Sequence, residues 1–242
     1  MKPNMLNVPI FFFLIISACT WGSCQQPVND DFVISGASVI HHEELGVTVW
    51  EISVDGQAGA TTPKPAGQLH TAPVLGYVFP TSLKPVDVGF NAVEGIVALA
   101  LTSHPDFDDT PLWDENVDGT FDNDGVIWHP HWVVLVEDER VKGGLSVRQF
   151  EKGDASVTLP PTNPGMPMYM DSPGFQVVNA GNTIKVVVPD YRISSQTNFN
   201  YDGVACYMEV NTEKADMPML GVYEVYSVAG GALTLDLTVA SN

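Results

Sequence analysis

The sequence has few basic residues: 10 Lys and Arg stand against 29 Asp and Glu, which gives a formal net charge of −19. It contains no basic cluster, so the phosphates of nucleic acid and anionic membrane surfaces would repel the chain. Nucleic-acid binding is therefore excluded. The sequence also lacks a G-x-S-x-G nucleophile motif, a P-loop, a G-x-G-x-x-G dinucleotide fingerprint and an H-E-x-x-H zinc motif. These absences remove several common enzyme classes and leave open whether the protein is an enzyme.

Cysteine is scarce as well. The chain has three, Cys19, Cys24 and Cys206, and no C-x-x-C pair, which argues against a cysteine-based zinc site. Two interpretations of the last two remain open. In an oxidising compartment Cys24 and Cys206 could form a disulfide, or Cys206 could be a buried core thiol.

Long apolar runs are absent except at residues 8–18, which are too few to span a bilayer as a helix but suit the core of a signal peptide. The next residue is Cys19, and Ile16-Ser17-Ala18-Cys19 resembles a bacterial lipobox, whose cysteine receives lipid. We therefore expect a signal peptide over 1–18, an exported tether over 19–30 and one domain over 31–242. The predicted location is the periplasm or the cell surface, including an outer-membrane lipoprotein. The only membrane contact expected is the lipid at Cys19.

After the tether, short segments rich in Val, Ile, Thr and aromatic residues alternate with turn residues, and no helical period persists. The sequence predicts an all-β fold, a single β-sandwich or jelly-roll-like domain with long loops at 55–72 and 159–173. We expect alternating burial at Thr48, Trp50, Ile52 and Val54, and a hairpin turn at 179–182. Residues 229–231 are predicted to turn a last hairpin between strands 219–227 and 232–240. The full set of predicted strands is 32–40, 46–54, 73–79, 95–103, 126–136, 144–150, 174–178, 182–188, 204–211, 219–227 and 232–240.

Residues 106–124 include eight carboxylates, which would repel one another without a counter-charge. Six residues at alternating positions predict a calcium site, with Gly119 allowing the sharp turn. The segment resembles the calcium loops of dockerin-like and thrombospondin-like repeats. It departs from an EF-hand because Gly125 replaces the final Glu and because strands are expected on both sides. The predicted ligands are Asp114, Asn116, Asp118, Thr120, Asp122 and Asp124.

Three of the six histidines flank this acidic segment. His129 and His131 would share one face of a strand, and a hairpin around the segment would bring His104 to them. Three imidazoles at one end of a sheet predict a site for Zn, Cu, Fe or Mn. The alternative is that His129 and His131 are ordinary polar residues packed between Trp128 and Trp132.

The order of Gly125, His129, His131, Glu137 and Gly143 partly resembles the cupin metal motif, although the spacings differ and no later His is present. The resemblance would add Glu137 as a fourth ligand and implies a metal-dependent enzyme. Two methionine tracts suggest a third possibility, copper, because thioethers favour Cu(I) and imidazoles accept Cu(II). Their residues are Met166, Met168, Met170, Met217 and Met219. Methionine is also a common core filler.

Three hypotheses about function follow. The first is an exported, calcium-stabilised β-sandwich that binds a metal ion or a small molecule. The second is a cupin-like metal-dependent enzyme, and the third is a periplasmic copper-handling protein. The sequence identifies no ligand or substrate.

Overall fold

A computed structural model describes residues 29–63, 69–104 and 127–242. It confirms the all-β prediction: β-strands dominate, and the described helices are four short 3₁₀ turns. These turns are η1 (Asp30–Phe32), η2 (Glu43–Leu45), η3 (Pro85–Val88) and η4 (Asp190–Ile193). Within the described part of the chain, no helix is long and apolar enough to cross a membrane.

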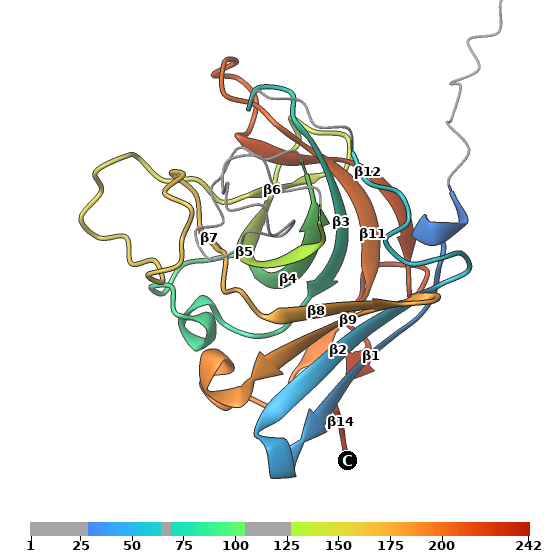
Figure 1. Cartoon of the computed structure of the whole chain (residues 1–242). Helices are drawn as coiled ribbons and strands as arrows, with labels where there is room; N and C mark the ends of the chain where they lie inside the picture. Colours follow the sequence, from blue (N-terminus) through green and yellow to red (C-terminus); the bar gives the residue numbers. More distant parts are fainter. Residues whose placement is uncertain (1–28, 64–68, 105–126) are drawn as a thin grey trace, which may run out of the picture.

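Two large sheets pack against each other, and one of them closes into a six-stranded barrel (Figure 1). The barrel closes because the strand at one edge, β4, also pairs with β5. Its strands, in order around the ring, are β4 (Ile96–Ser103), β3 (Pro73–Pro80), β11 (Val204–Val210), β12 (Leu220–Val228), β6 (Leu145–Val147) and β5 (His129–Glu137). A two-residue strand, β7 (Met170–Asp171), also pairs with β5 but is not one of the six strands of the barrel.

The second sheet is open and lies below the barrel in Figure 1. Its order is β14 (Ala240–Ser241), β1 (Ile34–His42), β2 (Val47–Val54), β9 (Thr183–Pro189) and β8 (Gln176–Ala180). The alternation expected along β2 is confirmed, with every second residue buried. The turn at Gly181, whose φ is +61°, joins β8 to β9 as the hairpin that the sequence predicted.

The predicted last hairpin is wrong. After β12 the buried Asp202 carboxylate accepts hydrogen bonds from the backbone N–H groups of Gly230 and Thr234, both at 3.4 Å, and this bends the chain away from β12. The following residues form β13 (Leu237–Thr238), which pairs with β10 (Asn200–Tyr201). The chain then reaches the open sheet, where β14 runs parallel to β1. The hydrogen bonds to Asp202 thus outweigh the alternation of apolar and polar residues over 232–240, which had predicted a strand paired with β12.

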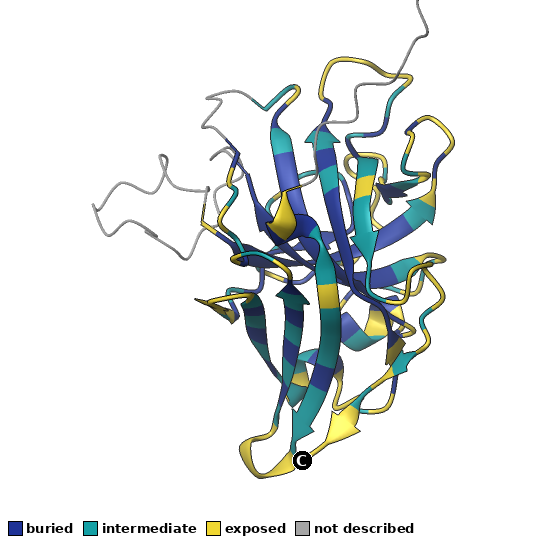
Figure 2. Ribbon diagram, turned by 90° about the vertical axis from the view of Figure 1, so that its right-hand side faces the viewer, coloured by how far each residue is buried: buried dark blue, intermediate teal, exposed yellow. Residues whose placement is uncertain are grey.

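The barrel wall has two apolar faces because successive residues of a strand point to opposite sides. Its outer face and the open sheet enclose a core rich in aromatic rings. Figure 2 colours the buried residues of the strands dark blue. We call this the interlayer core; it includes Trp50, Tyr77, Phe79 and Trp132. The inner face lines the barrel with smaller aliphatic and methionine side chains.

Candidate metal centre

The β4–β5 hairpin brings three histidines together at one end of the barrel. The two strands are antiparallel, with Thr102 opposite His129 and Ala100 opposite His131. His104 follows β4 directly, so it lies beside both. The predicted hairpin, and the meeting of His104 with His129 and His131, are confirmed. These residues are called the histidine cluster below.

The cluster points toward the barrel interior rather than toward the tryptophans. His131 shares a face of β5 with Val133 and Leu135, which belong to the barrel-interior cluster. Trp128 and Trp132 lie in the interlayer core on the opposite side. The alternative prediction, that His129 and His131 pack between Trp128 and Trp132, is therefore wrong. Pro130 is tolerated because at that position β5 pairs, among the described strands, only with β4.

The three imidazoles are close enough to share one ion. One ligating nitrogen from each ring lies within 4.8 Å of the others, and all three residues are buried. Nε2 of His104 lies 2.8 Å from Nε2 of His129. This separation is that of a hydrogen bond between the two rings. Two nitrogens bound at 2.0–2.1 Å to one tetrahedral zinc ion would lie about 3.3 Å apart, so the rings would have to move apart by about 0.5 Å to share an ion.

Hydrogen bonds on the outer side of two rings orient them. Nδ1 of His129 donates to the backbone carbonyl of Ile127 at 2.7 Å, which leaves Nε2 of the neutral ring with its lone pair. Nδ1 of His131 lies 3.0 Å from the Ser172 hydroxyl, which leaves Nε2 as the nitrogen that could bind an ion. Outer hydrogen bonds of this kind are typical of histidines that bind metals.

Burial also keeps the cluster in the form that binds metals. Desolvation lowers the pKa of His131 well below its usual range, and the nearby His129 and His104 lower it further. A hydrogen bond to the Asp171 backbone opposes this only in part. Because a metal ligand must be neutral imidazole, the lowered pKa of His131 favours the form of that ring that binds a cation.

Glu137 does not join the cluster. It ends β5, is exposed and pairs with Leu145. Six residues of extended strand place it roughly 20 Å from His131, because each residue advances about 3.3 Å. The even spacing puts it on the same side of the strand but at the opposite end, and this removes the fourth ligand that the cupin resemblance implied.

The cluster adjoins a cavity of about 220 Å³ inside the barrel. His104 and His131 line it together with Thr102, and the rest of the lining is apolar. Room exists because the inner face of β4 carries small residues, Ala98 and Ala100, whereas its outer face carries Leu99 and Leu101. On β3, Gly76 has no side chain, and a Cβ there would approach Cε of Met208 to 2.8 Å.

Two residues of this region were missed by sequence reasoning. Thr102 is 4% exposed, and its Oγ1 has no hydrogen-bond partner among the described residues. Thr102 lies two residues before His104, on the same face of the strand, and this spacing could have predicted that Thr102 belongs to the site. Ser172, which contacts His131, lies in a loop with no periodic pattern and carried no signal in the sequence.

The methionine tracts lie partly in the same place. Met166 and Met170 line the cavity, and Met168 is fully buried in the barrel-interior cluster. Met219 packs against that cluster from outside, and Met217 is half-buried. The first tract thus reaches the cavity that His104 and His131 line, and copper ligation by the methionines stays a prediction.

Cys206 is buried, lines the cavity and forms no disulfide with a described residue, and burial raises the pKa of its thiol to about 12. The predicted disulfide with Cys24 stays a prediction. Cys24 lies outside the described residues, as do the signal peptide and Cys19. The same holds for the whole predicted calcium site, Asp114, Asn116, Asp118, Thr120, Asp122 and Asp124. Calcium binding and lipidation therefore stay predictions.

Comparison of the chain with protein families, with curated proteins and with solved structures found no match. The histidine cluster and the cavity beside it are therefore the features that indicate a function.

Proposed function

We propose that this protein is an exported metalloprotein that holds one divalent transition-metal ion with His104, His129 and His131. The observation that supports it most is the convergence of three buried imidazoles whose nitrogens lie within 4.8 Å of one another. The rings of His129 and His131 also make hydrogen bonds with Ile127 and Ser172, as metal-binding histidines commonly do with their second nitrogen. One cation would bind the nitrogens that converge.

The ligand set favours some metals over others. Three neutral imidazoles suit Zn, Cu, Fe and Ni better than Ca or Mg, which prefer oxygen. Zinc is the natural first probe because sites with three histidines and one open position are common for it. This centre is separate from the calcium loop predicted at 114–124, and the two metals would occupy different residues.

Three protein ligands leave a coordination position for a small molecule. Because His104 and His131 line the cavity, a ligand in the barrel would reach that position from inside. A divalent ion there would polarise a bound oxygen and lower the pKa of a bound water. The chain itself supplies the orientation of the rings through Ile127 and Ser172 and the exclusion of bulk water by the apolar lining. The proposal is thus a metal-dependent binding protein or enzyme for small molecules.

Copper handling is a second candidate, supported by one observation: Met166 and Met170 line the same cavity as His104 and His131. It predicts that the double variant Met166→Leu, Met170→Leu weakens Cu(I) binding at least tenfold and leaves Zn(II) binding unchanged, because thioethers select the softer ion.

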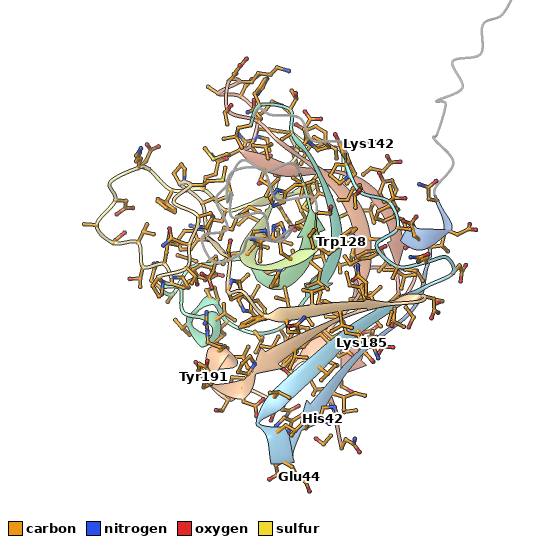
Figure 3. All side chains as sticks on the ribbon, viewed as in Figure 1. His42, Glu44, Trp128, Lys142, Lys185 and Tyr191 are labelled. Atoms are coloured by element: carbon orange, nitrogen blue, oxygen red, sulfur yellow. The ribbon has the colours of Figure 1, made fainter. Side chains whose placement is uncertain are left out.

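The test is elemental analysis of the mature chain, purified without chelator and without a histidine tag, followed by zinc titration. We expect one transition-metal ion per chain in the wild type and none in the double variant His129→Ala, His131→Ala. The matched control is His41→Ala, His42→Ala, which removes two histidines from β1, at the tip of the open sheet where Figure 3 labels His42 and Glu44. Equal metal content in the two double variants would contradict the proposal.

A further inference from the structure

The barrel cavity has one polar end and one apolar end. His104, Thr102 and His131 line it at the end where β4 stops and β5 starts. Pro80, Val204 and Val228 line it at the other end, where β3 and β12 stop and β11 starts. A molecule that fills the cavity therefore runs along the barrel, with one end at the histidine cluster.

The apolar end of the cavity has partly exposed apolar side chains at its rim. Val225 and Leu233 line the cavity and are 44% and 40% exposed, among the few large apolar side chains of the described residues that face solvent to this extent. Apolar side chains at the rim of an apolar cavity suit the entry of a hydrocarbon chain, which would lose contact with water as it moves inward.

The volume limits the size of the occupant. At about 220 Å³ the cavity is roughly half as large again as the ~150 Å³ cavity known to hold one benzene ring. It therefore suits a molecule of about ten non-hydrogen atoms. The lining is aliphatic, with valine, leucine and methionine side chains on most sides.

Thr102 indicates what the polar end of the occupant is. Its hydroxyl is buried and finds no partner within residues 29–63, 69–104 and 127–242, although a buried hydroxyl without a hydrogen bond costs free energy. Thr102 lies opposite His129 in the strand register and shares the cavity lining with His131. An oxygen atom of a ligand bound beside the histidine cluster would accept the missing hydrogen bond.

Charge decides between an alcohol and an acid. No Asp, Glu, Lys or Arg is among the described residues that line the cavity, so none of these residues would balance a charged ligand there. The proposed divalent ion, held by three neutral imidazoles, would find no counter-charge among the described lining residues. A carboxylate neutralises part of the charge of the ion, whereas an alcohol does not.

We propose that the cavity binds a small aliphatic monocarboxylate of about eight carbon atoms, with its carboxylate between the metal ion and the Thr102 hydroxyl and its chain along the barrel. This inference rests on the proposed metal centre. Octanoate, which has ten non-hydrogen atoms, is the probe that matches the volume, and 1-octanol is the neutral comparison.

The experiment is isothermal titration calorimetry of the full mature chain with octanoate and with 1-octanol, in the zinc-loaded and the zinc-free state. We expect octanoate to bind the zinc-loaded protein at least tenfold more tightly than the zinc-free protein, and 1-octanol to bind both states alike. Thr102→Val, which keeps the shape of the side chain, should weaken octanoate binding roughly five- to tenfold. Thr238→Val, an exposed change on β13, is the matched control and should have no effect.

A second variant tests the location. Ala100→Leu places three more carbon atoms in the cavity and should abolish octanoate binding while zinc still binds at one ion per chain. Zinc binding without octanoate binding in the wild type would overturn this inference and leave the metal centre standing. Equal octanoate binding with and without zinc would also overturn it. Failure of zinc itself to bind would overturn the proposed function.

Discussion

The two faces of the barrel wall differ in what they bury. The interlayer core contains close aromatic contacts, such as Trp50 against Phe79, Trp132 and Phe199 with ring centroids 5.2–5.8 Å apart. The barrel interior has smaller side chains, a cavity of about 220 Å³ and the histidine cluster. Because β4 and β5 contribute to both, alternate residues of the same strands serve stability on one side and the site on the other.

This contrast shows where the molecule can accept imperfect packing. Protein interiors are normally close-packed, and an empty apolar space forgoes dispersion contacts. The barrel interior accepts that cost together with the unpartnered Thr102 hydroxyl. The interlayer core, which closes the barrel against the open sheet, keeps the fold stable while the interior stays available for a ligand.

The largest expected effect compares two leucines on neighbouring strands. Leu99 is fully buried in the interlayer core, and Leu135 lines the cavity. Leu99→Ala should lower the free energy of unfolding by about 4 kcal/mol and Leu135→Ala by about 2 kcal/mol, because a side chain beside a cavity has fewer contacts to lose. Chemical denaturation of the metal-free protein measures both. Equal losses would remove the distinction between the two cores.

The next effect concerns the turn between β5 and β6. The Arg140 guanidinium donates two hydrogen bonds to Asp138, at 2.8 and 2.7 Å, and Ser146 adds a third at 2.7 Å. These contacts lower the pKa of Asp138 well below its usual value of 3.8. Below pH 3.8 the unfolded chain takes up this proton before the folded chain does, so stability rises with pH in that window.

Asp138→Asn should therefore lower the free energy of unfolding by about 1 kcal/mol at pH 7, since Arg140 is nearly half exposed and the pair is partly screened. The loss should shrink as the pH falls from about 5 toward the pKa of folded Asp138, because the wild type loses the same contribution. Denaturation at a series of pH values measures this. A loss that stays constant down to pH 2 would assign the effect to packing instead of charge.

The smallest effect has the opposite sign. Thr102→Val removes a buried hydroxyl that has no partner and keeps the volume of the side chain. The ligand-free protein should become more stable, by up to about 1 kcal/mol, because the desolvation cost of the hydroxyl disappears. Thermal unfolding of the variant, compared with Thr238→Val, checks this. A destabilised Thr102→Val protein would show that the hydroxyl has a structural partner.

Much of the fold could be predicted from local sequence, whereas barrel closure could not. Alternation along β2 and the turn at Gly181 follow from short-range rules, and the β4–β5 hairpin needed only two strands around one segment. The barrel instead depends on β3 pairing with β11 and on β12 pairing with β6, and such distant pairings leave no local pattern.

In the candidate site too, residues close in sequence could be predicted and residues brought in by tertiary packing could not. His129 and His131 are two residues apart on one strand, so their meeting could be read directly. Glu137 satisfied the same parity rule but lies at the other end of β5, since parity specifies a face and not a position along the strand. Ser172 reaches His131 through tertiary packing of a loop, which no spacing could indicate.

The central claim is that the three histidines hold one metal ion. X-ray absorption spectroscopy of the full mature chain, loaded with one equivalent of zinc, tests it most directly. Ligation by the three histidines predicts nitrogen scatterers at 2.0–2.1 Å with the outer-shell signal of three imidazole rings, lost in the His129→Ala, His131→Ala variant. A first shell of oxygen alone, unchanged in that variant, would place the zinc on carboxylates and rule out ligation by the histidines.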